Sequence, residues 1–83
     1  MGLLAVLRGG GDLASGVALR LVRCGIQVVV TELPRPLAVR RKVSFAQAVY
    51  DGQIEIEGVP AVLARIEEIP GLLRQGIVPV VVD

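Results

Sequence analysis

The sequence predicts an α/β fold built on a mostly parallel sheet of about four to five strands. Hydrophobic residues make up 53% of the 83 residues and aromatic residues 2%, so the core is expected to consist of Val, Leu, Ile and Ala. Several apolar segments run on without alternation, as is typical of strands that are buried on both faces. Segments with helical spacing separate these runs. Together these patterns favour a partial doubly wound sheet.

A βαβ unit is predicted at the start of the chain. Leu3–Leu7 is a short apolar run, which indicates a buried strand. Apolar residues at helical spacing follow over Leu13–Val22, and Gly25 then marks the end of that helix. The β-branched segment Ile26–Val30 predicts the second strand. A glycine-rich turn connects the first strand to the helix.

The segment after this unit changes character. Leu33–Pro36 contains two prolines and predicts a turn. A short helix is expected over Leu37–Lys42, and its end carries the cations Arg40, Arg41 and Lys42. These cations fit either a solvated helix end or a patch that faces an anion. Ser44 is expected to cap a second short helix over Phe45–Tyr50.

Two further strands and a helix are expected in the second half of the chain. Gln53–Glu57 alternates between polar and apolar residues, which indicates a strand with one solvated face. After Gly58, Val59–Ala64 returns as its hairpin partner or begins the next strand, and Pro60 favours a position at the sheet edge. A helix is predicted over Ile66–Gln75.

The last predicted strand is Ile77–Val82. With strand order 3-2-1-4, this strand lies at a sheet edge beside Leu3–Arg8. It is β-branched and apolar, and Pro79 alone interrupts its pairing capacity. Exposed edges of this kind pair with other chains. We therefore expect a homo-oligomer, formed by edge pairing or by burial of an uncovered sheet face.

The glycine-rich turn carries a candidate phosphate site. Gly9-x-Gly11-x-x-Ala14 fits the loose form of the dinucleotide-binding fingerprint, in which glycines let backbone N–H groups approach a phosphate. The helix N-terminus adds partial positive charge. The candidate cofactor-binding residues are Gly9, Gly10, Gly11, Asp12, Leu13, Ala14 and Ser15. The alternative is a turn that binds nothing, with Asp12 as a helix N-cap.

Glu32 and Arg35 complete the candidate site. Glu32 follows the second strand about twenty residues after the glycines, the spacing of a carboxylate that accepts hydrogen bonds from a ribose. Its charge disfavours a 2′-phosphate, which favours NAD or a related pyrophosphate nucleotide over NADP, although Arg35 could offset that repulsion. FAD and a molybdopterin dinucleotide also contain a pyrophosphate. The pattern predicts a Rossmann-like nucleotide-binding half-domain over residues 1–83.

Composition limits the other possibilities. The chain has no histidine and one cysteine, Cys24, so no metal site and no internal disulfide are predicted. Cys24 is expected to be a small buried thiol in a reducing cytoplasm. A net charge of +1 does not favour nucleic acid, and no apolar run approaches the ~20 residues of a membrane span.

The chain resembles the N-terminal part of the selenium-dependent molybdenum hydroxylase system proteins. The resemblance rests on Arg8–Gly16, Thr31–Pro36, Val39–Arg41, Phe45 with Ala48–Tyr50, Val59 after Glu57-Gly58, and Pro79–Asp83. It covers nearly the whole chain and implies a Rossmann-type domain that further domains follow, so this chain is expected to be part of a longer one. It also implies a role in the maturation of molybdenum hydroxylases, with the hydroxylase or its cofactor machinery as a partner.

These features and the resemblance fit three functions. The first is a nucleotide-binding accessory protein for molybdenum hydroxylase maturation. The second is a structural or docking module whose glycine turn is empty. The third is an NAD-dependent oxidoreductase, for which Tyr50 and Asp51 are isolated and histidine is absent. Catalytic residues are not predicted, and whether the chain is an enzyme stays open.

Overall fold

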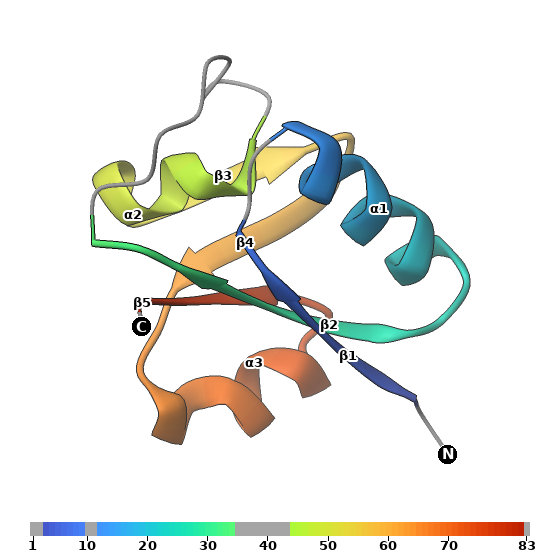
Figure 1. Ribbon diagram of the computed structural model, residues 1–83. Helices are drawn as coiled ribbons and strands as arrows, with labels where there is room; N and C mark the ends of the chain where they lie inside the picture. The colour runs from blue at the N-terminus through green and yellow to red at the C-terminus, as the bar shows by residue number, and fades with distance from the viewer. Residues whose placement is uncertain (1–2, 10–11, 35–43, 83) are drawn as a thin grey trace.

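The computed structural model describes residues 3–9, 12–34 and 44–82. It shows a small α/β fold in which α1 and α2 lie on one face of a five-stranded mixed sheet and α3 on the other (Figure 1). The strands are β1 (Leu4–Arg8), β2 (Gln27–Glu32), β3 (Gln53–Ile56), β4 (Val59–Leu63) and β5 (Val78–Val82). The helices are α1 (Asp12–Arg23), α2 (Ala48–Asp51), which the 3₁₀ turn η2 (Phe45–Gln47) precedes, and α3 (Ile69–Arg74), which η3 (Ile66–Glu68) precedes.

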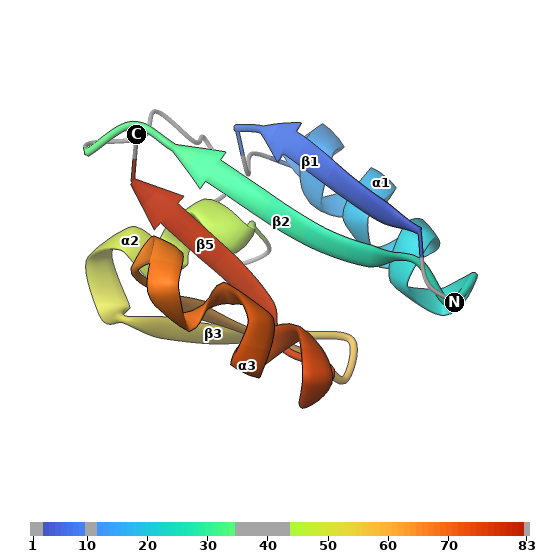
Figure 2. The same ribbon diagram turned by 90° about the horizontal axis from the view of Figure 1, so that it is seen from below.

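The strand order is β1-β2-β5-β4-β3, and three of the four strand pairs are parallel. The mostly parallel sheet is confirmed. The predicted place of the last strand is wrong, because β5 lies in the centre between β2 and β4 (Figure 2). Burial explains this. Val78, Pro79 and Val80 are buried on both faces of the sheet, whereas Leu4, Val6 and Arg8 of the edge strand β1 are exposed.

Two prolines occur in inner strands, so the expectation that Pro60 requires a sheet edge is also wrong. In β4 the N–H of Leu63 bonds to Gly52 on the β3 side, and the N–H of Ala64 bonds to Val80 of β5. The backbone N–H groups of successive strand residues point to opposite neighbours, so the nitrogen of Pro60, like that of Ala64, faces β5. The β4–β5 ladder, however, begins one residue after Pro60, at Ala61. No ladder hydrogen bond is lost there.

Pro79 is accommodated in the same way. Val80 directs its carbonyl to β4, where it accepts the N–H of Ala64. The nitrogen of Pro79 is therefore turned toward β2, and the β2–β5 ladder begins at the pair Val30 and Val80. Both prolines precede the first ladder contact on the side where they lack a donor.

Two crossovers run in opposite directions along the sheet. The chain moves inward from the edge strand β1 to β2 through α1, and it moves inward from the other side, from β4 to β5, through α3. Right-handed connections then place the two helices on opposite faces, as Figure 1 shows. The main core lies on the α1 and α2 side and contains Ala18, Leu19, Val28, Val30, Phe45, Ala48, Ile56, Ala61, Val78 and Val80.

The short-range expectations for the second half of the chain are confirmed. The hydroxyl of Ser44 accepts the N–H of Ala46 and caps the turn that leads into α2. Strands β3 and β4 form a hairpin through Glu57 and Gly58. Pro70 lies in the first turn of α3, where its missing N–H costs no helical bond. The helix expected over Leu37–Lys42, with its three cations, lies outside the described residues.

Candidate functional site

A cavity of about 250 Å³ lies at the carboxyl ends of β1 and β2. Its lining residues are Arg8, Gly9, Thr31, Glu32 and Leu33. Ligands of open α/β sheets bind outside the carboxyl ends of the strands, next to the loops that leave them. This cavity is therefore the candidate functional site, and it lies where the glycine-rich turn begins.

Gly9 directly follows β1 in a backbone conformation that glycine alone adopts easily. Its φ is +91°, and its N–H donates to the carbonyl of Thr31 at 2.7 Å. That bond ties the end of β1 to the end of β2. Among the residues that the structure describes, no atom lies within 4 Å of where a Cβ would stand at Gly9.

Glu32 ends β2 as a buried carboxylate with 8% of its surface exposed. Its Oε1 accepts the N–H of Leu33 at 3.0 Å. Side chains alternate along a strand, so Glu32 lies on the same side of the sheet as Val28 and Val30 of the core. The carboxylate is held at the wall of the cavity by the backbone that follows it.

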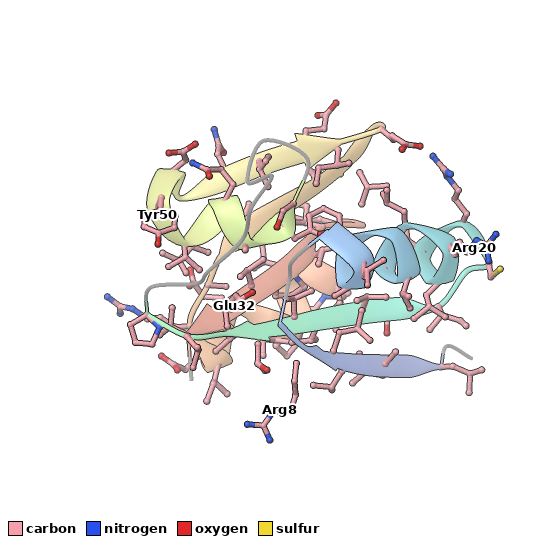
Figure 3. The ribbon with its side chains drawn as sticks, turned by 45° about the horizontal axis from the view of Figure 1, so that its top comes forward. Arg8, Arg20, Glu32 and Tyr50 are labelled. Atoms are coloured by element: carbon pink, nitrogen blue, oxygen red, sulfur yellow. The ribbon has the colours of Figure 1, made fainter. Side chains whose placement is uncertain are left out.

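Arg8 and Glu32 point to opposite sides of the sheet (Figure 3). The strand register gives the same result. Arg8 pairs with Thr31 and points to the same face of the sheet, whereas Glu32, the next residue of β2, points to the opposite face. The exposed guanidinium of Arg8 and the buried carboxylate of Glu32 thus approach the cavity from two sides. An anion and a hydroxyl-bearing group could each find a charged partner here.

The structure places the remaining predicted site residues unevenly. The turn residues Gly10 and Gly11, as well as Arg35, lie outside the described residues. The backbone of Asp12 begins α1, while Leu13 is 89% exposed and Ala14 is half-buried. The structure brings together Gly9 and Glu32 from the predicted set.

Ser15 has a structural contact that the sequence did not indicate. Its side chain is buried, and its Oγ accepts the N–H of Phe45 at 2.8 Å. This bond joins the first turn of α1 to η2, thirty residues further along the chain. Ser15 therefore helps to hold the layer of helices that covers the core.

Sequence reasoning missed Thr31 and Leu33 as lining residues. Thr31 enters the site because it is in register with Arg8, and its hydroxyl donates to the carbonyl of Leu7 at 3.5 Å. If the two predicted strands are aligned in parallel so that Leu3 pairs with Ile26, Thr31 falls beside Arg8 at the cavity. Leu33 follows directly from the end of β2.

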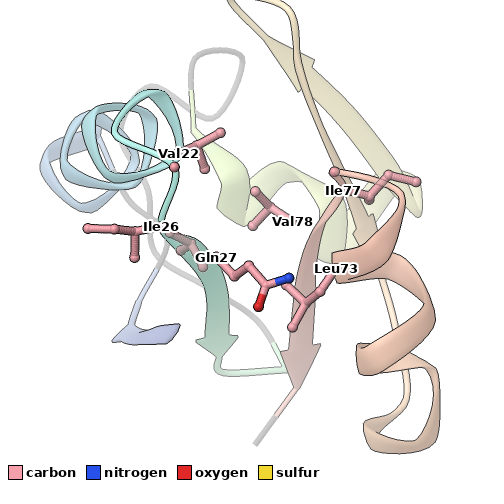
Figure 4. Close-up of a pocket in the computed structure, with 9 residues that line it drawn as sticks. Val22, Ile26, Gln27, Leu73, Ile77 and Val78 are labelled. Atoms are coloured by element: carbon pink, nitrogen blue, oxygen red, sulfur yellow. The ribbon is translucent and has the colours of Figure 1, made fainter. Parts of the chain in front are cut away.

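A second cavity, of about 180 Å³, lies at the opposite, amino end of β2 and β5 (Figure 4). Its labelled lining is mainly apolar and comprises Val22, Ile26, Leu73, Ile77 and Val78 with Gln27. Cys24 lies nearby in the turn that ends α1. It is exposed, so the expected buried thiol is wrong: α1 ends at Arg23 and the turn carries Cys24 out of the core.

Within residues 3–9, 12–34 and 44–82, no three His, Cys, Asp or Glu side chains gather as a metal-binding group. Over the same ranges, no helix has the length and apolar character needed to cross a bilayer.

The chain is similar to a curated bacterial protein. It is 49% identical over 81 residues to the uncharacterized protein YqeB of Escherichia coli (strain K12). The match covers 96% of this chain and 15% of YqeB, so the chain spans about one seventh of that relative's length. No family model matches the chain. No solved structure matches it either.

Proposed function

We propose that the chain is a Rossmann-like nucleotide-binding half-domain that holds a pyrophosphate nucleotide at the carboxyl ends of β1 and β2. The observation that carries the proposal is the position of Gly9 and Glu32. A glycine with positive φ and a buried carboxylate end two neighbouring parallel strands and line one cavity. This is the combination that a phosphate and a ribose require.

The sheet supports the Rossmann-like assignment. Strands β5, β2 and β1 are neighbours and parallel, in the 3-2-1 arrangement of a mononucleotide-binding half, with β5 as its third strand. Helix α1 follows β1 directly and packs on the sheet beside it. The hairpin of β3 and β4 is then an addition beyond that third strand.

Different groups of the site would bind different parts of the ligand. Backbone N–H groups of the turn from Gly9 into α1 would hold the phosphate, and the helix N-terminus would add partial positive charge. Glu32 would accept hydrogen bonds from ribose hydroxyls, and Arg35 would be available to a phosphate. The cavity of about 250 Å³ is smaller than the ~300–1,000 Å³ of typical ligand pockets, so it fits one ribose phosphate, with the rest of the ligand on the surface.

NAD is the cofactor that these groups favour. The Glu32 carboxylate repels a second negative charge on the 2′-oxygen of the ribose, which disfavours NADP. When bound, NAD supplies a hydride acceptor, but we assign no catalytic step to this chain. The resemblance to the selenium-dependent molybdenum hydroxylase system proteins suggests an accessory role in hydroxylase maturation in the cytoplasm.

A docking module with an empty turn is the second candidate. It is favoured by the contacts that Ser15 and Glu32 already make, with Phe45 and Leu33, inside the protein. Both contacts serve the fold. A binding measurement distinguishes the two functions.

The test is calorimetric titration of the chain with NAD, NADP, FAD, ATP and CTP. We expect NAD to bind more tightly than NADP. Glu32→Gln keeps a carbonyl oxygen for the N–H of Leu33 but loses the charge, so NAD should bind about ten- to a hundredfold more weakly and the preference over NADP should narrow. Gly16→Ala, on the exposed side of α1, is the matched control and should leave both affinities unchanged. Absence of binding by all five nucleotides would instead support the docking module.

A further inference from the structure

The cavity of about 180 Å³ at the amino ends of β2 and β5 lies at the opposite edge of the sheet from the candidate functional site. It is therefore a separate feature of the molecule. Half-buried apolar side chains surround it, from α1, α3 and the turns that follow them: Val22, Ile26, Leu73 and Ile77. Among the described residues that line it, none carries a charged side chain. A ligand of this cavity has to be mainly apolar and uncharged.

The two walls of the cavity are built by the same local sequence. Residues 21–26 end α1 and residues 72–77 end α3, and both segments read Leu-x-Arg-x-Gly-Ile. Gly25 and Gly76 have positive φ values, +83° and +75°. In each segment the isoleucine N–H donates to the leucine carbonyl five residues earlier, at 2.9 and 3.0 Å. Each wall is thus held by hydrogen bonds within its own segment, so the space between the walls does not have to close.

Pro79 explains why β2 and β5 do not pair beside the cavity. The N–H of Gln27 faces β1, so the next residue, Val28, turns its N–H and C=O toward β5. In a continued parallel ladder that carbonyl would accept the N–H of residue 79, and a proline has none. The ladder therefore begins two residues later, at Val30. Because Val28 lines the cavity, its buried carbonyl is an acceptor to which β5 gives no donor.

Gln27 adds a polar side chain to the lining. In Figure 4 this side chain extends from β2 toward Leu73, on the α3 side of the cavity. A side-chain amide both donates and accepts hydrogen bonds. Together with the carbonyl of Val28, it suits a neutral group that also donates and accepts, and a hydroxyl is the smallest such group.

The volume of the cavity limits the ligand to a single ring. An apolar cavity of about 150 Å³ in another protein binds benzene, so about 180 Å³ accommodates a six-membered ring with one small substituent. We propose that this cavity is a second ligand site, which binds a small neutral aromatic ring carrying one hydroxyl group. The ring packs between Val22, Ile26, Leu73 and Ile77, and the hydroxyl bonds to the polar groups of Gln27 and Val28.

The test is a titration of the isotope-labelled chain with phenol, followed by the amide resonances in proton–nitrogen correlation spectra. Saturable shifts are expected at Gly25, Gln27 and Gly76, while Gly9 at the opposite edge of the sheet should not shift. Toluene has a ring of the same size without the hydroxyl, so phenol should bind about two- to tenfold more tightly. No saturable shift at Gly25 and Gly76, or equal affinities for the two probes, would overturn the proposal.

A variant that fills the cavity provides an independent measurement. Leu73→Phe puts a ring into a space that holds only one, so phenol affinity should fall by about tenfold or more. Leu63→Phe is the matched control, because Leu63 is 37% exposed at the carboxyl end of β4, and it should bind phenol as the wild type does. Thermal unfolding establishes that each variant is folded. Unchanged phenol binding by a folded Leu73→Phe would show that phenol binds elsewhere, and if that variant does not fold, the comparison of phenol with toluene decides.

Discussion

Two glycines of the first βαβ unit differ in backbone conformation. Gly9 has a φ of +91°, and Gly16 lies inside α1, on its exposed side. At neither position would an added Cβ meet an atom of residues 3–9, 12–34 or 44–82 within 4 Å. Backbone conformation is therefore the property that separates them. The fingerprint pattern identified Gly9 as special, and the structure gives the conformational reason.

This pair yields a stability prediction with an internal control. Gly16→Ala should stabilise the protein by about 0.5–1 kcal/mol, because alanine favours the helix and restricts the unfolded chain. Gly9→Ala should destabilise it by about 1 kcal/mol or more, because an alanine is strained at positive φ. For a domain of this size, each change corresponds to a shift in Tm of about 4–8 °C per kcal/mol, measured by calorimetry. Equal shifts of one sign would contradict the assigned conformation of Gly9.

Ser15 gives a second prediction at the residue scale. Ser15→Ala removes the acceptor of the buried Phe45 N–H, which should cost about 1–3 kcal/mol of unfolding free energy in urea titrations. A ligand role for the hydroxyl predicts something different: weaker nucleotide binding with little loss of stability. Ser44→Ala, which removes a cap contact in the same region, is the comparison for stability alone.

At the scale of elements, the β3–β4 hairpin shows how a local rule and an ion pair compete. The two loop residues, Glu57 and Gly58, have φ values of +51° and +83°. Two-residue loops with both φ values positive favour Asn-Gly, because Asn tolerates the left-handed region better than Glu does. Glu57 nevertheless pairs with Arg23 across the surface.

The free energies of the ion pair and of the left-handed backbone conformation at Glu57 can be compared. An exposed ion pair is worth about 0–1 kcal/mol, whereas a residue other than Gly or Asn in the left-handed region costs roughly 1–2 kcal/mol. Glu57→Asn should therefore stabilise the protein by some tenths of a kcal/mol up to about 1 kcal/mol in thermal unfolding. Arg23→Ala, measured alone, gives the contribution of the pair. A lower Tm in Glu57→Asn with little effect of Arg23→Ala would contradict the expected ranking.

Most elements could be predicted from the sequence, because each has a local signal. The apolar run of β1, the helical spacing of α1, the Ser44 cap and the Gly58 turn all act within a few residues. The prolines could not be interpreted in the same way. Whether Pro60 disrupts a sheet depends on where the neighbouring ladder begins, and that register follows from pairing with a strand fifteen or more residues away.

The candidate site was predictable to a similar extent. Gly9 and Glu32 were identified from the spacing of the fingerprint, and the structure brings them to one cavity. Thr31 was missed because its position depends on the register between β1 and β2. Ser15 was assigned to the ligand from its place in the motif, but the sequence gives no sign of its contact with Phe45.

At the scale of the whole molecule, the strand order expected from the sequence is wrong. The expected order puts the last strand at an edge beside β1, whereas in the structure β5 lies between β2 and β4. The β5 residues Val78, Pro79 and Val80 are enclosed by helices on both sides of the sheet, so β5 takes the centre and β1 the edge.

A central position of β5 leads to a prediction that differs from the one expected if β5 were an edge strand. Val80 is 0% exposed and lies in the main core, so Val80→Lys would bury an unpaired ammonium group. We expect this variant to lose cooperative unfolding altogether, since a small domain has only ~5–15 kcal/mol of stability. Val82→Lys, two residues further along the same face at 39% exposure, is the control and should unfold cooperatively near the wild-type Tm. Circular dichroism and thermal unfolding of the two variants measure the difference. A folded Val80→Lys would place β5 at an edge, where its side chain reaches water.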